Sequence, residues 1–199
     1  MYSQKHFKKQ NHFFSAGFTL IEVMVSISII ALLSSVVMSA TNSARKNARD
    51  SKRISSIREL QVGLELYFSD NQTYPPADVI GESANRAGDP AMGDAGNWDT
   101  PFDNDFLTSL VGGKYMQGHV FDPLGVAGSS FQNNLRYYRF PAGSWGCPVN
   151  RGAFYVLGVV DMETSSGRHQ LSPGWNCPNF DFGNPAVYGF EFVVGKYES

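Results

Sequence analysis

The feature that most constrains this chain is an apolar run near its N-terminus that contains one acidic side chain. Between Phe18 and Ala40, 23 residues carry a single charged side chain, that of Glu22. About 20 mostly apolar residues are enough to cross a bilayer as a helix. A carboxylate inside such a segment costs roughly 2.5–3.5 kcal/mol on insertion scales, so Glu22 is a candidate functional residue. The run itself offers no basic side chain as a partner for this carboxylate.

A short basic segment precedes the apolar run. It carries Lys5, Lys8 and Lys9 and no acidic residue. This charge pattern is typical of a targeting segment rather than of a folded part of the protein. The junction between the two segments reads AGFTLIE over residues 16–22.

This junction resembles the processing site of type IV pilins and type II secretion pseudopilins. In that family a basic leader ends at a glycine where a prepilin peptidase cuts, and a Phe-Thr-Leu-Ile/Leu-Glu sequence then opens a long apolar helix. The resemblance implies removal of a leader, residues 1–17, by cleavage after Gly17, and N-methylation of Phe18. It also implies that Phe18, Thr19 and Glu22 serve assembly, with the carboxylate of Glu22 paired to the α-amino group of Phe18 on a neighbouring subunit.

The same resemblance implies a structural subunit of a pilus or pseudopilus and not an enzyme. Its expected partners are copies of itself in a filament, the prepilin peptidase, and an inner-membrane assembly platform with its motor. The subunit would first cross the cell membrane once, with its head outside the cytoplasm, and would then join a fibre on the cell surface or in the periplasm. A secretion pseudopilin, a DNA-uptake subunit and an anchored binding module that never assembles stay open as alternatives.

Basic residues also follow the apolar run, over residues 45–58. Counted alone, they would place the C-terminal side in the cytoplasm; cleavage of the leader on the cytoplasmic face, implied by the resemblance, favours the opposite orientation. The cluster could attract anionic lipid headgroups or DNA phosphates. Because residues 45–58 contain no aromatic side chain to stack on bases, we favour salt bridges to neighbouring subunits or a solvated helix face.

The sequence predicts one helix from residue 18 to about residue 69, since no proline precedes Pro75. Residues 18–40 form its membrane-spanning or filament-core half, and residues 41–70 form an amphipathic half. Apolar side chains at helical spacing predict one buried face in the second half, with charged side chains, Arg53 among them, on the polar side. That face comprises Ile54, Ile57, Leu60, Leu64 and Phe68, and is widened by Val62 and Leu66. The helix is expected to end at Asn71 in a left-handed cap.

Residues 71–199 are predicted to form a globular α+β head. A short helix is expected near 105–110, and strands are expected over 118–122, 135–140, 153–162 and 186–194. Turn residues separate these strands, as in an antiparallel meander. The predicted fold is therefore a long N-terminal helix packed on a C-terminal antiparallel sheet, which the resemblance identifies as a pilin fold.

Cys147 and Cys177 are the only cysteines. An even number of cysteines in an exported protein predicts a disulfide between them. The resemblance also suggests a C-terminal disulfide loop of this kind.

A Ca²⁺ site and a catalytic site find less support. Asp94, Asp99, Asp103 and Asp105 form an acidic loop whose oxygens suit Ca²⁺, but a solvated loop with Asx turns is the favoured interpretation. No other cofactor is expected. His119 and His169 occur singly, and neither a nucleophile elbow nor a phosphate-binding loop occurs in the sequence.

Overall fold

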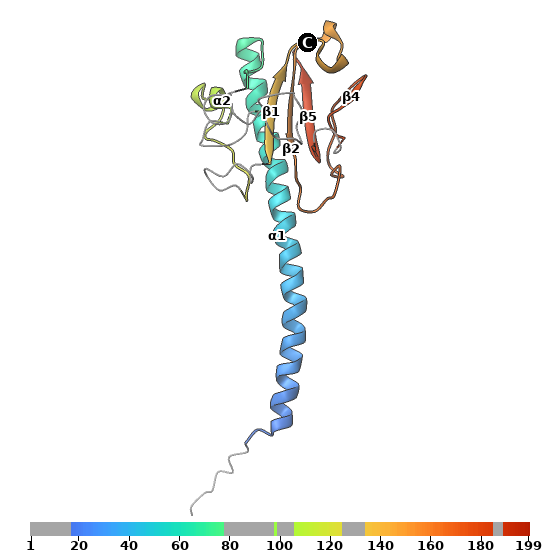
Figure 1. Cartoon of the computed structure of the whole chain (residues 1–199). Coiled ribbons are helices and arrows are strands. Elements are labelled where there is room, and N and C mark those ends of the chain that lie inside the picture. Colours follow the sequence, from blue (N-terminus) through green and yellow to red (C-terminus); the bar gives the residue numbers. More distant parts are fainter. Residues whose placement is uncertain (1–16, 78–97, 99–105, 125–133, 185–188) are drawn as a thin grey trace, which may run out of the picture. The chain divides into compact units, whose positions relative to one another are not determined.

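The computed structural model describes residues 17–77, 98, 106–124, 134–184 and 189–199. It divides the chain into two compact units, Met1–Ser43 and Ala44–Ser199. Helix α1, Leu20–Asn71, runs through both units, and all the other described elements belong to the second unit (Figure 1).

The helical part of the first unit exposes its apolar side chains. Every residue from Gly17 to Ala40 is exposed. The hydroxyls of Ser26, Ser28 and Thr41 donate hydrogen bonds of 2.7–2.8 Å to carbonyls four residues earlier, which satisfies them within the helix. Helix α1 is long and apolar enough to cross a membrane, and its most apolar 18-residue window has a mean hydropathy of 2.4.

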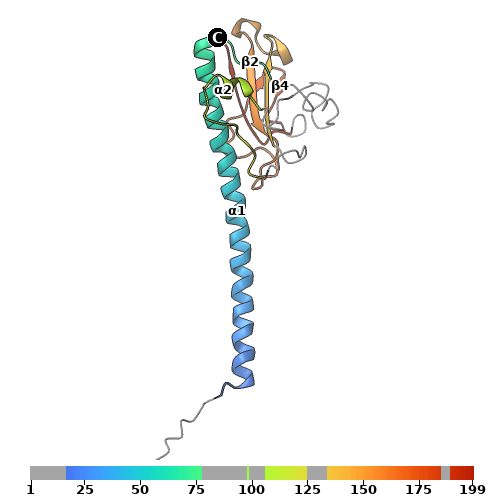
Figure 2. The same ribbon diagram turned by 90° about the vertical axis from the view of Figure 1, so that its left-hand side faces the viewer.

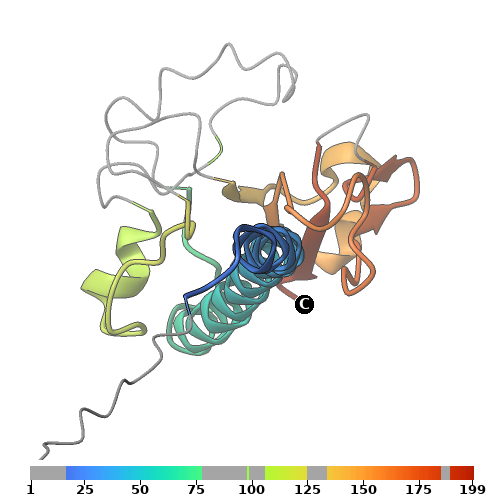
Figure 3. The ribbon, with the colours of Figure 1, turned by 90° about the horizontal axis from the view of Figure 1, so that it is seen from below.

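The second unit contains a three-stranded antiparallel sheet in the order β1–β2–β5. Its strands are β1 (Leu135–Phe140), β2 (Phe154–Val159) and β5 (Phe192–Tyr197). A smaller hairpin pairs β3 (Asn176–Cys177) with β4 (Phe180–Asp181). The remaining elements are the short helix α2 (Thr108–Gly112) and the 3₁₀ turns η2 (Ser144–Gly146) and η3 (Val149–Arg151). In the view of Figure 3, α2 and the sheet lie on opposite sides of the second half of α1.

All six residues of the central strand β2 are buried, so side chains cover both faces of the sheet. On one face Tyr155 and Leu157 pack with the second half of α1 in a first core. Figure 2 shows this half of α1 beside the sheet. On the other face Phe154 and Val156 belong to a second core, which includes both cysteines. The first core comprises Ile54, Ile57, Leu60, Leu64, Tyr74, Phe106, Leu107, Leu110, Val120, Leu135, Tyr137, Tyr155, Leu157, Val159, Met162, Phe192 and Val194. The second core comprises Trp98, Phe140, Cys147, Phe154, Val156, Cys177, Phe182, Phe190, Val193 and Tyr197.

The predicted α+β fold is confirmed, and so is the strand at 135–140, but other boundaries differ. Residues 118–122 form no strand; they are an irregular segment whose Asp122 pairs with Arg53. Of the predicted strand 186–194, residues 186–188 lie outside the described residues, and β5 begins only at Phe192. Phe190, which precedes β5, belongs to the second core, and Phe192 belongs to the first. The expected helix at 105–110 is α2, which begins later, at Thr108.

The predicted buried face of α1 is narrower than expected. Its isoleucines and leucines between Ile54 and Leu64 are buried, as predicted, but Val62 is 61% exposed and Leu66 is 50% exposed. Arg53, predicted to lie on the polar side, has a fully buried side chain because three carboxylates surround it. The left-handed residue at the end of the helix is Gln72, with φ 59°, and not Asn71.

Gly195 lies where a larger residue would collide with the sheet's second face. A Cβ placed there would approach the ring of Trp175 to 2.5 Å and the carbonyl oxygen of Tyr155 to 2.7 Å. Gly195→Ala is therefore expected to lower the free energy of unfolding by about 1–3 kcal/mol through overpacking, as urea denaturation followed by circular dichroism would measure. Gly118→Ala is the matched control, because no atom lies within 4 Å of its Cβ position. Equal stability of the two variants would contradict the prediction.

Candidate assembly site

The N-terminus of α1 is closed by a reciprocal pair of hydrogen bonds between Thr19 and Glu22. The carboxylate atom Oε2 of Glu22 accepts hydrogen bonds from the backbone N–H of Thr19 at 2.9 Å and from its hydroxyl at 2.7 Å. The backbone N–H of Glu22 donates in turn to the Thr19 hydroxyl oxygen at 3.3 Å. This is a capping box, in which a Thr and a Glu three residues apart satisfy donors that a helix start leaves free.

The capping box supplies the carboxylate with partners that the sequence reasoning overlooked. Basic side chains are not its only possible partners, because a hydroxyl and a backbone N–H three residues away also bind a carboxylate. The signal was present, since Thr19-Leu20-Ile21-Glu22 has the Ser/Thr-x-x-Glu spacing of a capping box. The acid thus has local hydrogen bonds while it lies among apolar side chains.

The two residues expected at the cleavage point precede the capping box and are open to solvent. Phe18 is 85% exposed, and among the described residues other than its chain neighbours no atom lies within 4 Å of a Cβ placed on Gly17. The bond between them is therefore sterically accessible to a peptidase. The amino group that cleavage would create on Phe18 lies one residue before the capping box.

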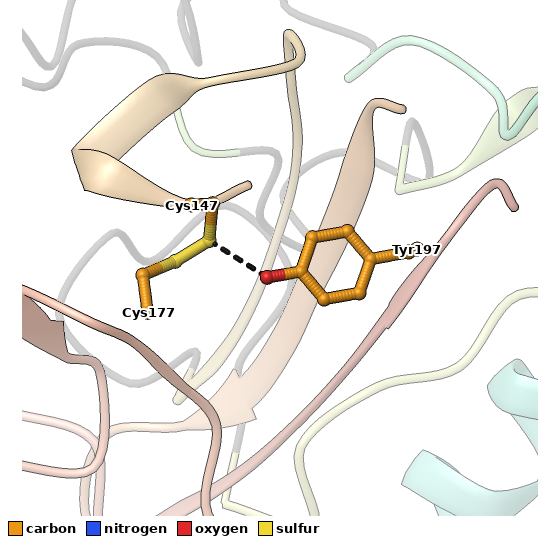
Figure 4. The surroundings of a disulfide bond; sticks show 3 residues. All are labelled: Cys147, Cys177 and Tyr197. Atoms are coloured by element: carbon orange, nitrogen blue, oxygen red, sulfur yellow. Dashed lines mark hydrogen bonds between the residues drawn. A yellow bond between two sulfur atoms is a disulfide. The ribbon is translucent and has the colours of Figure 1, made fainter. Parts of the chain in front are cut away.

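Cys147 and Cys177 form a disulfide that joins two separate parts of the second unit. Cys147 follows turn η2 and Cys177 ends strand β3, and both sulfurs belong to the second core. The hydroxyl of Tyr197 on β5 donates a hydrogen bond of 3.1 Å to Sγ of Cys147 (Figure 4). The bridge therefore holds the irregular segments over the face of the sheet that α1 does not cover.

The basic run of α1 takes part in an ionic cluster inside the second unit. Arg53, whose side chain is fully buried, donates from Nε and Nη2 to the two carboxylate oxygens of Asp122, at 2.7 and 3.0 Å. Its Nη1 donates to Asp50 at 2.6 Å and to Glu163 at 3.2 Å. Arg49 binds the same Glu163 through two hydrogen bonds. Two arginines that were expected to face lipid, DNA or neighbouring subunits are instead neutralised within the chain.

Hydrogen bonds outweigh the effect of burial on the pKa values of Asp50 and Glu163. Burial raises the pKa of Asp50, but hydrogen bonds from Thr164, the backbone of Glu163 and Arg53 lower it more, so its net pKa lies below the ordinary value. The hydrogen bonds from Arg49 lower the pKa of Glu163. Burial lowers the pKa of Arg53, and the hydrogen bonds and charges of Asp122 and Asp50 more than reverse this.

These shifts predict that acid weakens the second unit. Asp50 and Glu163 have lower pKa values in the folded chain than their ordinary values of 3.8 and 4.5, so the folded state binds fewer protons than the unfolded state. Their contribution to the free energy of unfolding is fully present above about pH 5 and is lost as the pH falls below about 4. Urea denaturation at pH 6, 4 and 3 should show this loss, and Asp50→Asn should reduce it. A free energy of unfolding that stays constant over this range would contradict the prediction.

The predicted Ca²⁺ candidates Asp94, Asp99, Asp103 and Asp105 lie outside the described residues. Among the residues that the structure does describe, no group of three or more His, Cys, Asp or Glu side chains is arranged to hold a metal ion. In the ionic cluster the acidic side chains surround a guanidinium group, which serves as their cation.

Comparison with known proteins bears on the part of the chain that holds the capping box. The prokaryotic N-terminal methylation motif matches residues 14–38, which include Gly17, Phe18 and Glu22. Over this N-terminal segment the chain is similar to type IV pilins and type II secretion pseudopilins. No solved structure matches the chain.

Characterised relatives of this pilin-like chain match it over less than half of their own length. The type II secretion system core protein G of Aeromonas hydrophila is 38% identical over 63 residues, which are 32% of this chain and 44% of the relative. The corresponding protein of Escherichia coli K12 is 41% identical over 59 residues, 30% of this chain and 41% of the relative. The type IV wide pilus major component PilA4 of Thermus thermophilus is 38% identical over 58 residues, 29% of this chain and 44% of the relative. These relatives are components of secretion systems and pili, and none of the three is described as an enzyme.

Proposed function

We propose that this chain is a structural subunit of a type IV pilus or of a pseudopilus. In this proposal a prepilin peptidase removes residues 1–17, Phe18 is N-methylated, and the subunits polymerise through the first half of α1. Before assembly the apolar half of α1 anchors the subunit in the cell membrane, with the second unit outside the cytoplasm. A membrane assembly platform and its motor then move the subunit into the fibre.

The observation that carries the proposal is the state of Glu22. Both hydrogen bonds from Thr19 go to the same oxygen, Oε2, whereas Oε1 accepts none from any described residue. The carboxylate therefore keeps one oxygen for a further donor. A neighbouring subunit can supply that donor as the α-amino group of its Phe18, which cleavage after Gly17 would create. Pairing of this amino group with Glu22 would favour one axial shift between neighbouring subunits. Any other shift would leave a charge unpaired among apolar helices, which is costly.

The exposed apolar helix supports polymerisation over a purely soluble role. Its apolar side chains from Phe18 to Ala40 are exposed, and none of them belongs to either core of the described chain. They must be covered by lipid or by helices of other subunits, or first by lipid and later by such helices. In a fibre, helix packing replaces the contacts with lipid.

The relatives favour no single kind of fibre, since they include secretion proteins and a pilus component. A secretion pseudopilin is therefore the second candidate function. Electron microscopy of tagged cells distinguishes the two, because a pilus extends from the surface and a secretion pseudopilus stays short. A DNA-uptake role has less support, because Arg49 and Arg53 are already bound to Asp50, Asp122 and Glu163.

Replacing Glu22 with alanine tests assembly directly. We expect Glu22→Ala to be cleaved normally but to yield at least about tenfold less fibre, equivalent to about 1.4 kcal/mol per subunit contact. Glu22→Gln should also fail, since it keeps the shape of the side chain and loses the charge. Ser26→Ala, one turn later, is the control and should assemble. Mass spectrometry reports cleavage and methylation, and electron microscopy of sheared fibres reports assembly. Normal fibres from Glu22→Ala would contradict a role of this charge in assembly, whereas a lack of fibres from the unaltered chain would favour the membrane-anchored module that never assembles.

A further inference from the structure

A pocket of about 520 Å³ lies in the second unit between α1 and the irregular segment that follows α2. Helix α1 contributes Lys52, Ser56 and Glu59, which lie on one side of the helix because they are four and three residues apart. The opposite wall is residues 118–123, with the rings of His119 and Phe121 6.5 Å apart. The volume falls in the range of sites for small ligands.

Two polar atoms of the pocket lining are buried and lack a hydrogen-bond partner among the described residues. They are Oγ of Ser56, a residue only 1% exposed, and Nδ1 of His119. Buried polar atoms in native proteins are normally satisfied by protein, water or a ligand. An occupant that can both donate and accept hydrogen bonds would satisfy the two atoms together.

The pocket also has an unpaired charge at each end of its helical wall. Neither Lys52 nor Glu59 makes a hydrogen bond or an ion pair with a described residue, in contrast to Arg49 and Arg53 on the same helix. Asp122 lines the pocket too, but Arg53 and the N–H of Leu124 occupy its carboxylate. The usable charges are therefore one ammonium group and one carboxylate.

The spacing of these two charges sets the length of a matching ligand. Seven residues of α-helix separate Lys52 from Glu59, a rise of about 10.5 Å. An extended peptide of three residues spans about 10–11 Å. Its free carboxylate could pair with Lys52 and its free amino group with Glu59, while its backbone groups reach Ser56 and His119.

We propose that this pocket binds short peptides of about three residues through their charged ends. Phe121, which is 41% exposed, and Pro123 provide an apolar wall for a small side chain of the peptide. The proposal goes beyond a role in filaments, since it involves none of the residues at the start of α1.

The test is a titration of the full chain in detergent micelles with trialanine. Binding is read from the imidazole NMR signals of His119, with His169, which does not line the pocket, as the internal reference. We expect saturable shifts of the His119 signals with a Kd of about 1 mM. Blocking either end of trialanine, by acetylation or amidation, should weaken binding about two- to fivefold, as expected for single exposed ion pairs. Blocking both ends should weaken it by the product of the two effects, about four- to twenty-five-fold.

Charge reversal supplies the sharpest comparison. Lys52→Glu should weaken the binding of trialanine and strengthen that of trialanine amide, which carries only a positive charge. Lys46→Ala, which removes an exposed lysine of α1 outside the pocket, should leave both affinities unchanged. The proposal is overturned if the His119 signals do not move, which leaves water as the occupant. It is also overturned if the doubly blocked peptide binds as well as trialanine, or if Lys46→Ala has the effect of Lys52→Glu.

Discussion

Arg53→Ala is expected to lower the free energy of unfolding by about 3–5 kcal/mol, more than any other single substitution proposed for this chain. The guanidinium group binds Asp50, Asp122 and Glu163 while its own side chain is fully buried. Its removal leaves the fully buried carboxylate of Asp122 without a cation, and desolvated charges without partners are costly. Urea denaturation followed by near-ultraviolet circular dichroism, which reports on the packed aromatic cores, measures the loss.

Two variants separate the buried ion pairs from a general effect of positive charge. Arg58→Ala removes an exposed arginine from the same helix and should change stability by no more than about 0.5 kcal/mol. Arg53→Met with Asp122→Leu removes both members of the buried pair and should recover part of the loss, because no charge then stays unpaired at that position. A stability of Arg53→Ala equal to that of Arg58→Ala would show that the cluster does not stabilise the fold.

Loss of the disulfide is expected to have the second largest effect. Replacing Cys147 and Cys177 together with serine should lower the free energy of unfolding by about 3–4 kcal/mol, because the unfolded chain regains the freedom of a 30-residue loop. The loss should be concentrated in the second core, to which both sulfurs belong. Reduction of the wild-type chain should reproduce the stability of the double variant.

Tyr197→Phe provides the comparison for the disulfide. It removes the hydroxyl that donates to Cys147 but keeps the ring and the bridge, so it should cost only about 0.5–1.5 kcal/mol. If the double serine variant and Tyr197→Phe were equally stable, the bridge would contribute little to the fold.

The long helix and one strand of the fold were predictable from the sequence, because apolar residues recur in them with a regular period. Absence of proline and the spacing of Ile54, Ile57, Leu60 and Leu64 predicted α1 and its buried face. The strand 135–140 was predictable from its alternation. The position of β5 was not, since Gly195 and Lys196 lack strand character and the strand depends on pairing with β2. Hairpin β3–β4 has only two residues per strand, too few for a periodic signal.

Of the candidate site, the motif at the start of α1 was predictable from the sequence, whereas the ionic cluster was not. Residues 16–22 carry a local sequence motif, and the prokaryotic N-terminal methylation motif matches residues 14–38. The ionic cluster joins Arg53 to Asp122 and Glu163, which lie 69 and 110 residues further along the chain. No local pattern indicates such a pairing. The sequence alone therefore does not decide whether a charged residue beside the buried face of an amphipathic helix is exposed or buried. Its contacts in the tertiary structure decide this.

The hydrogen bonds between Thr19 and Glu22 have a consequence for how reversible a fibre can be. The acid already accepts two hydrogen bonds within its own chain, so the pairing proposed for a fibre would add a donor at Oε1 instead of rescuing a bare anion. The net gain per contact is then smaller than the full insertion cost of a carboxylate. Breaking this contact during disassembly of such a fibre would then cost less than exposing an unsatisfied carboxylate.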